Sequence, residues 1–455
     1  MDSIDRKKII ENILHLIKNN DEHSLKELIE DTHPADLAEI LQALDDDDKR
    51  DYLFGLMSAE TASYVVTELD EVTRQDIVSD LGTDRLSAIV DEMDSDDAAD
   101  IVAELPEQIQ EQVLANIEPQ DRDEVEKLLV HDEDSAGGIM ALEYIAVYED
   151  QIVDDAIREI RSRAEEIDEV FYIYAVDRGN RLVGVVPMKS LFLRNPKRVI
   201  KDIMHTDVIS VGVDMDQQEV ANIVRKYNLS AVPVVDRYKR LVGRITVDDI
   251  VDVLHEEANE DIHHMAGITY EETLQEKSTF RITKNRLPWL IVAFTGELMA
   301  AMVLSRFEVS LAELAALTCF IPVIMAMGGN AGIQSSTTVV RSMALNESGT
   351  ILKESFNREF RVALLNGLSI GIMLALVIQI WPKIENPIYL GAIIGFSMMI
   401  VIINSTLFGT VIPYALNRFN IDPAIATGPF ITTSNDVLGL LIYLSMATFY
   451  LKHLR

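Results

Sequence analysis

The chain lacks the residues that build thiolate sites, because Cys319 is the single cysteine among its 455 residues and lies in an apolar run. A disulfide framework and a thiolate zinc site are therefore excluded. Basic residues are scarce as well, with 40 Lys and Arg against 75 Asp and Glu and a formal net charge of −35. Because so acidic a surface repels phosphate backbones, the composition excludes a nucleic-acid partner.

The shortage of positive charge is confined to the first 280 residues. Only 9 of the acidic and 12 of the basic residues lie beyond residue 280, which leaves 66 acidic against 28 basic residues before it. The first twenty residues, MDSIDRKKIIENILHLIKNN, contain no long apolar core and are not expected to act as a signal peptide. The sequence therefore predicts several domains, with an acidic cytoplasmic half joined to an apolar half.

The apolar half contains five stretches of membrane length, since a spanning helix needs about 20 predominantly apolar residues. They are 287–307, 311–343 with a glycine-rich break, 360–381, 388–416 and about 424–450. We expect a five-helix α-helical transmembrane domain, and an odd number of spans puts the termini on opposite sides. Lys and Arg residues before the first span and in two of the loops place the N-terminal half in the cytoplasm and the C-terminus outside.

Two patterns divide the acidic half. Residues 1–135 contain short amphipathic helices that repeat about every 24 residues, which predicts an all-α superhelical N-domain. Residues 140–256 instead contain two pairs of β-rich runs, FYIYAVD with RLVGVVP and AVPVVD with RLVGRIT, and these resemble a tandem pair of α+β cystathionine-β-synthase (CBS) domains. The expected domains are an acidic helical N-domain (1–135), two CBS domains (136–200 and 201–256), a plug or linker helix (248–280) and the transmembrane domain (281–455).

A polar, glycine-rich segment, MGGNAGIQSSTTVVRSMA at 327–344, follows the second apolar stretch. Gly328, Gly329 and Asn330 lie near its start. The segment is too polar and too rich in glycine for a helix that faces lipid. One interpretation is close helix packing through small residues. The other is a broken helix whose freed backbone groups line an ion pathway, as is tolerated at membrane depth where backbone faces protein or water.

Asp436 is an acid about twelve residues into the last apolar stretch. A charge at membrane depth is costly, so function is its default interpretation. Thr432 and Asn435 add oxygen atoms within one turn, and this set of oxygen ligands suits a hard cation such as Mg²⁺. A second acid, Glu297, lies in the middle of the first span, where it is either another pore acid or an interfacial group; the sequence does not decide between them.

These residues also carry a resemblance. The segments Gly328-Gly329-Asn330 and Ser434-Asn435-Asp436, together with five spans, two CBS domains and an acidic helical N-domain, resemble the MgtE family of magnesium channels. The resemblance implies a homodimer in membrane lipid, with a pore lined by the second and fifth spans and a Mg²⁺ site at Asp436. It also implies cytosolic Mg²⁺ sites that close this pore. The residues that match these regulatory sites are Asp96, Asp97, Asp100, Gly138, Asp216, Asp249, Asp252, Glu257 and Glu260.

Charge repulsion supports the same regulation without the family. Asp249, Asp252, Glu256 and Glu260 are three or four residues apart and share one helical face, where like charges repel. Divalent cations between two acidic surfaces would relieve that repulsion and draw the surfaces together. The alternative is an acidic face that is merely solvated.

The remaining patterns concern nucleotides and catalysis. Thr246-x-x-Asp249 in the second CBS domain matches a pattern that holds a ribose, so ATP is a possible ligand. Because no P-loop and no nucleophile–base set is present, the chain is not expected to be an enzyme. The sequence therefore predicts a Mg²⁺-selective uptake channel closed by cytosolic Mg²⁺. The alternatives are a divalent-cation transporter coupled to Na⁺ or H⁺, and a membrane metal sensor without a pore.

Overall fold

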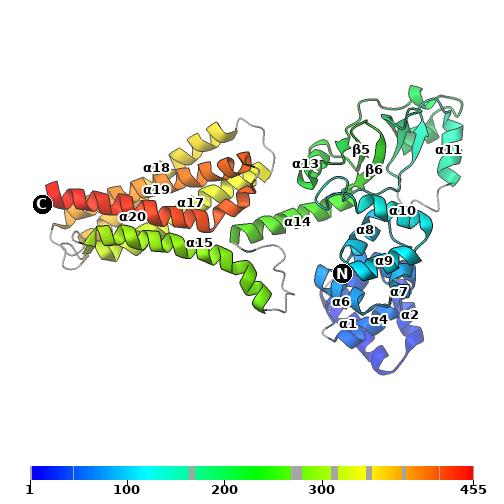
Figure 1. Ribbon diagram of the computed structural model, residues 1–455, viewed down its shortest axis with the longest axis horizontal. Coiled ribbons are helices and arrows are strands. Elements are labelled where there is room, and N and C mark those ends of the chain that lie inside the picture. Colours follow the sequence, from blue (N-terminus) through cyan, green and yellow to red (C-terminus); the bar gives the residue numbers. More distant parts are fainter. Residues whose placement is uncertain are drawn as a thin grey trace. The chain divides into compact units, whose positions relative to one another are not determined.

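The computed structural model describes residues 3–44, 46–162, 170–266, 268, 279–308, 316–344, 351–381, 386–419 and 421–453. The chain forms two compact units, Met1–Val253 and Leu254–Arg455, which are described one at a time (Figure 1). The first unit holds short helices and two small sheets, and the second holds the long apolar helices.

The first unit begins with a series of short helices whose starts are fixed by acidic and hydroxyl side chains. Asp21, Asp46, Ser58 and Asp70 each accept a backbone N–H in the first turn of the helix that follows. Part of the acidic composition thus serves as helix caps. The helices are α1 Ser3–Lys18, α2 Glu22–Asp31, α3 Pro34–Gln42, α4 Asp47–Gly55, α5 Ala59–Thr67, α6 Glu71–Asp80, α7 Thr83–Val90, α8 Ser95–Ala103, α9 Glu107–Asn116 and α10 Pro119–Leu128.

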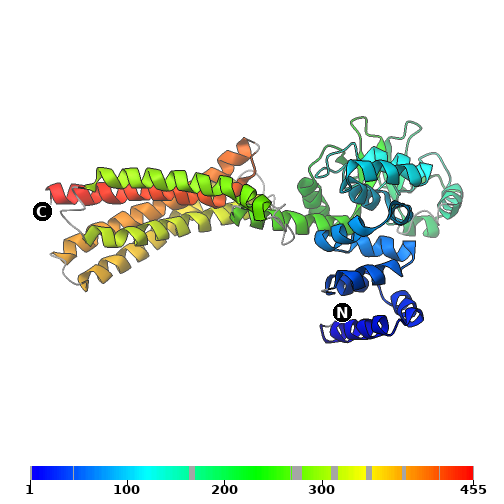
Figure 2. The same ribbon diagram turned by 60° about the horizontal axis from the view of Figure 1, so that its bottom comes forward.

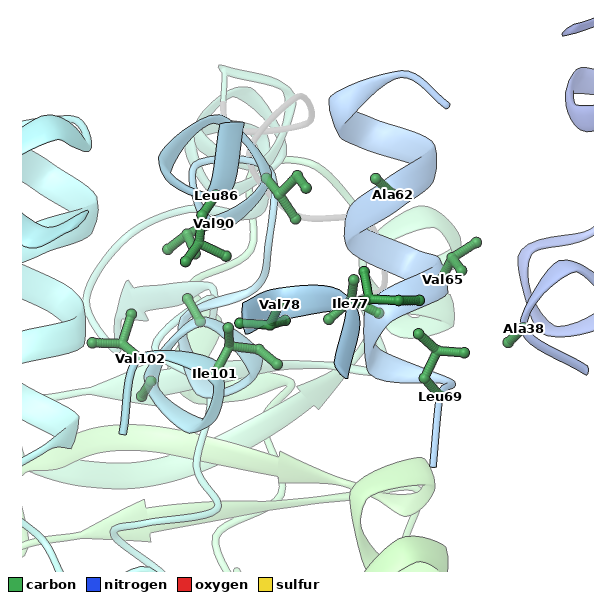
Figure 3. Packing of buried hydrophobic residues seen from close by; sticks show 14 of the residues in the cluster. Ala38, Ala62, Val65, Leu69, Ile77, Val78, Leu86, Val90, Ile101 and Val102 are labelled. Carbon is green, nitrogen blue, oxygen red and sulfur yellow. The ribbon is translucent and has the colours of Figure 1, made fainter. Parts of the chain in front are cut away.

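These helices stack in a superhelical order. Helix α3 packs on α5, α5 on α7 and α7 on α9, while α10 packs on α8. Their apolar faces share one core, in which Ala62 and Val65 of α5 lie near Ile77 of α6, and Leu86 and Val90 belong to α7 (Figure 3). The all-α superhelical N-domain predicted from the repeat is confirmed.

Two three-stranded sheets follow, and they repeat each other. In each sheet the first two strands are parallel and the last two are antiparallel, with a register shift at the equivalent pairs Ala175/Val176 and Val234/Val235. This repetition confirms the tandem CBS pair. Its elements are β1 Ala146–Tyr148, α11 Val153–Ser162, β2 Tyr172–Val176, β3 Leu182–Pro187, α12 Met188–Leu193, η1 Ile200–Asp202, β4 Val211–Gly212, α13 Gln217–Tyr227, β5 Ala231–Val235 and β6 Leu241–Thr246.

Helix α14, Val247–Ala266, starts directly after β6 and continues into the second unit. It covers the first part of the expected plug helix at 248–280. Residues 267 and 269–278 of that range lie outside the described residues, and 279–280 belong to the next helix, α15.

The second unit confirms the five predicted spans. Five helices among the described residues are long and apolar enough to cross a membrane. They are α15 Thr279–Arg306, α17 Ala316–Ala344, α18 Ile351–Gln379, α19 Pro387–Arg418 and α20 Pro429–His453. Figure 2 shows them from a second direction, with α15 beside α20 as in Figure 1.

Two expectations about these spans are wrong. The segment 327–344 is not a break, because α17 continues through it as one helix. The last helix starts at Pro429 and not near Ala424, because Pro423–Thr427 forms the short 3₁₀ helix η2 instead. Asp436 is therefore the eighth residue of α20, in its first third.

Candidate ion site and regulatory acids

Helices α15 and α20 pack closely side by side. The rings of Trp289 and Phe430 meet edge to face with centroids 6.3 Å apart. Further along both helices, a Cβ atom added at Gly296 would overlap the side chain of Thr433. Residues with higher numbers in α15 contact residues with higher numbers in α20. The two helices therefore run parallel. Glycine at position 296 permits this close approach.

The polar turn of α20 faces this contact and the helix α17. Asp436 is 8% exposed and Asn435 is 3% exposed. The amide of Asn435 donates a hydrogen bond of 2.9 Å to the carbonyl oxygen of Met325 in α17. The hydroxyl of Thr432 donates to the Gly428 carbonyl oxygen at 2.9 Å, which leaves lone pairs of its own oxygen available. The expected ion site is thus built on one turn that α17 holds in place.

Glu297 of α15 is a side-chain hydrogen-bond partner of Asp436, as is the neighbouring Asn435. The sequence had left Glu297 undecided between a pore acid and an interfacial group. The structure brings it to the one carboxyl group predicted to bind the ion, although the two residues lie on the first and last spans. No periodicity or motif in the sequence connects them.

The three glycine-segment residues have different surroundings. A Cβ atom at Gly328 would overlap the Asn435 side-chain oxygen and lie 2.8 Å from Val401 Cγ1, and the Gly328 carbonyl accepts a 2.6 Å hydrogen bond from Ser405. At Gly329 the nearest atom would be 3.5 Å away, an ordinary contact. Asn330 is exposed in the single chain. Gly328 therefore serves close helix packing, which is the first of the two interpretations of this segment.

Three of the predicted regulatory acids come together where α8 of the N-domain meets the start of α14. Burial raises the pKa of Asp96 well above its usual range, with Asp249 as the strongest charged neighbour. Burial also raises the pKa of Asp97 to about 7, with help from the charges of Asp94, Asp100 and Asp249. The pKa of Asp249 is raised for the same reason, although Thr246 donates to its Oδ2 from both the backbone and the hydroxyl at 2.8 Å.

Two other predicted residues meet in the linker before the first CBS domain. Asp216 caps α13 by accepting from the backbone N–H groups of Gln218 and Glu219, and it pairs with Ser135. Gly138 lies three residues beyond Ser135 in a tight turn, where a Cβ atom would overlap the carbonyl oxygen of Asp132. The structure thus places Asp216 and this linker side by side, while Gly138 has a packing reason of its own.

The other predicted acids occupy later turns of α14, where the sequence analysis missed a cluster. Asp252 and Glu260 are exposed and Glu257 is partly buried. Glu260 lies 3.8 Å from His264 Nε2, and His264 Nδ1 lies 2.5 Å from Asp422 Oδ2, just before η2. Burial and the charges of Asp422 and Glu260 raise the pKa of the neighbouring Asp261 to about 6.

Among the residues that the structure describes, no three His, Cys, Asp or Glu side chains converge as a ready metal-ligand set. The carboxylates of α8 and α14 are close enough to perturb one another but are not arranged around a common point. Their chemistry nevertheless fits a hard divalent cation, because all the donor atoms are oxygens.

Five spans that contain a buried carboxylate, preceded by an N-domain and a CBS pair, describe a multi-pass membrane protein with a soluble N-terminal part. Family models match the chain as a divalent cation transporter (321–446), an MgtE intracellular N domain (32–134) and CBS domains (136–194 and 200–256). The chain belongs to the MgtE family of magnesium transporters, and Mg²⁺ is the ion that it carries. Members of this family are transporters and not enzymes, as expected.

Individual relatives agree with this assignment. The magnesium transporter MgtE of Thermus thermophilus is 35% identical over 338 residues, 74% of each chain. The same protein of Bacillus subtilis is 37% identical over 332 residues, 72% of each chain. A crystal structure of the soluble part of a magnesium transporter aligns with a TM-score of 0.51 at 29% identity, covering 56% of this chain and 99% of that one. A structure of the cytosolic domain of the Mg²⁺ channel MgtE in complex with ATP aligns with a TM-score of 0.51 at 33% identity, covering 54% and 99%.

Proposed function

We propose that the protein is a Mg²⁺-selective channel for uptake across the cytoplasmic membrane. The observation that carries this proposal is Asp436, a carboxyl group 8% exposed inside a membrane span and beside the oxygen atoms of Asn435 and Thr432. The membrane potential supplies about 2.3 kcal/mol per charge per 100 mV, and a divalent cation gains about twice that inward. Uptake through a channel therefore needs no coupling ion.

Cytosolic Mg²⁺ would close this channel through the acids of α8 and α14. Asp96 and Asp97 face Asp249 across the contact between the N-domain and the second CBS domain. Ionised carboxylates repel one another there, and Mg²⁺ bound between them would turn that repulsion into attraction. Asp100, Gly138, Asp216, Asp252, Glu257 and Glu260 complete the proposed regulatory set.

ATP is the proposed ligand of the second CBS domain, as in the related cytosolic domain solved with ATP. Thr246 and Asp249, the two groups of the ribose pattern, are hydrogen-bonded to each other at the start of α14. Because Asp249 belongs to both proposed sites, nucleotide and regulatory Mg²⁺ would act on the same residue.

The proposed assembly is a homodimer in membrane lipid, with the N-terminal domains cytoplasmic and the C-terminus outside. The parallel contact of α15 and α20 supports termini on opposite sides, because the first and last spans then cross the membrane in the same direction. Glu297, exposed on the single chain at mid-span, supports a pore formed where another copy or water covers this face.

The proposal is tested by patch recording from proteoliposomes that contain Asp436→Asn, with little Mg²⁺ on the regulatory side. The amide keeps the shape but removes the charge that holds a strongly hydrated divalent ion, so Mg²⁺ current should be lost while the protein still assembles. Glu308→Gln, which removes a carboxylate beyond the end of α15, is the control and should conduct. Wild-type current from Asp436→Asn would refute the site. A current that follows a Na⁺ or H⁺ gradient would favour the secondary transporter.

A further inference from the structure

Glu297 is an acid in the described spans whose role the ion site has not yet explained. It lies well inside the apolar window Ile282–Arg306 of α15, and it is exposed on the single chain. A carboxyl group that faces lipid at this depth costs several kcal/mol, so such groups turn to water or to other protein surfaces. This side of α15 is therefore expected to face a polar space in the membrane.

The position of Glu297 opposite Asp436 follows from the packing of their helices. Trp289 meets Phe430, Gly296 meets Thr433, and Glu297 comes next in the same register. The close approach at Gly296 leaves little freedom for the two helices to slide. The Asp436 side is fixed as well, because the adjacent Asn435 is bound to the Met325 carbonyl oxygen of α17. The contact of the two carboxyl groups is thus built into the packing of three helices.

We propose that Glu297 is a second carboxylate for the transported cation, which it holds together with Asp436, and that it sets the preference for divalent over monovalent ions. This inference rests on the proposed function. A cation that lies between two carboxyl groups in contact is attracted by both of them. A divalent cation neutralises both charges, whereas a monovalent cation leaves one uncompensated. Mg²⁺ retains most of its waters and is usually bound through one or two carboxylates, so the pair suits a hydrated ion.

Three substitutions separate charge from hydrogen bonding at this position. Glu297→Asp keeps the carboxylate, Glu297→Gln keeps a hydrogen-bond donor for Asp436 but removes the charge, and Glu297→Leu removes both. Measured in proteoliposomes with little regulatory Mg²⁺, the Gln and Leu variants should need roughly 10- to 100-fold more Mg²⁺ for half-maximal flux, the range for losing a group that supports a metal ligand. The Asp variant should retain most of the wild-type flux.

The ratio of Mg²⁺ to K⁺ flux is the second readout, because a merely structural role would not change it. Glu297→Gln should still pass K⁺ in divalent-free solution, which shows an assembled pore, and its Mg²⁺ to K⁺ ratio should fall. Glu308→Gln, just beyond the end of α15, is the control and should match the wild type in both measurements.

The outcomes separate this inference from the function on which it rests. Wild-type Mg²⁺ flux and ion ratio in Glu297→Gln, with loss of flux in Asp436→Asn, would overturn the role of Glu297 and leave the ion site at Asp436 intact. A wild-type Gln variant beside a defective Leu variant would also overturn it, since Glu297 would then only orient Asp436. Wild-type flux in both Glu297→Gln and Asp436→Asn would refute the ion site itself.

Discussion

At the scale of single residues, Gly328 and Gly329 differ although they are neighbours in the sequence. A methyl group at Gly328 would displace Asn435 from its bond to α17 and press on Val401, whereas at Gly329 it would fit. We expect Gly328→Ala to destabilise the protein by about 1–3 kcal/mol, the usual cost of overpacking, and to reduce Mg²⁺ flux. Gly329→Ala is the matched control and should behave as wild type. Thermal unfolding in detergent measures the stability of both variants, and assays in proteoliposomes measure their Mg²⁺ flux. A fully stable Gly328→Ala protein would contradict the packing described for α17.

Asp97 gives the soluble unit a pH dependence whose sign is fixed by its pKa. Its pKa is about 7 in the folded protein against 3.8 for a free side chain, because it is buried among other acids. Its contribution to stability is therefore full below pH 4 and is lost as pH rises through 7, by up to about 1.4 kcal/mol per pH unit. Without divalent cations, the contact of α8 with α14 in the full-length protein should be more stable at pH 6 than at pH 8. Proteolysis at this contact should therefore be slower at pH 6.

The Asp97→Asn variant should reduce this pH dependence, since the neutral amide stands in for the protonated acid. Asp123→Asn, at an exposed acid of α10, should leave it unchanged. Equal protease resistance of the wild-type protein at both pH values, with divalent cations chelated, would show that these acids do not control the contact.

At the scale of helices and strands, the sequence predicted those elements whose signal is local. Apolar runs of membrane length marked the five spans, and the two copies of Arg-Leu-Val-Gly marked the CBS pair. The unbroken α17 was not predicted, because glycine has a low intrinsic helix propensity and the compensating contacts with distant helices such as α19 and α20 are not visible in the local sequence. The predicted start of α20 was several residues too early, because the apolar turn Pro423–Thr427 has the composition of a helix.

The candidate site was predicted only in part for a similar reason. Asp436 stands out alone, because a carboxylate in an apolar stretch is itself a signal. Its partner Glu297 and the contact of His264 with Asp422 depend on which distant helices meet, and no local pattern contains that information.

The contact of His264 with Asp422 links the end of α14 to the segment that leads into α20. Asp422 also caps η2 by accepting from the backbone N–H of Ala424 at 2.8 Å, so the imidazole binds a residue that shapes the approach to α20. His264→Ala should weaken this link and raise the cytosolic Mg²⁺ needed for closure severalfold. His263→Ala is the neighbouring control, because His263 Nδ1 contacts the Asn259 carbonyl oxygen of its own helix. Patch recording across a Mg²⁺ titration measures the midpoint, and identical midpoints for both variants would exclude the link from gating.

At the scale of the whole molecule, closure is expected to depend on several Mg²⁺ ions acting together. Each site contributes about 1.4 kcal/mol at ten times its Kd, whereas about 5.5 kcal/mol is needed to move a switch from 1:99 to 99:1. About four sites therefore suffice. The proposed sites would use part of the acidic excess of the first 280 residues, because each site needs carboxylates that repel one another until an ion arrives.

The corresponding experiment removes the acids of α14 together. The quadruple Asp249/Asp252/Glu257/Glu260→Ala protein should conduct but require severalfold more Mg²⁺ for closure, since losing one site's contribution of about 1.4 kcal/mol lowers the closed-to-open ratio about tenfold at a given Mg²⁺ concentration. Glu107/Glu111/Glu118/Asp123→Ala removes the same charge from exposed positions of the N-domain and is the control for net charge alone. Current and protease protection of residues 256–280 are followed across the same Mg²⁺ titration. If the α14 variant keeps the wild-type midpoint in both, or if the control shifts equally, binding at α14 does not close the pore.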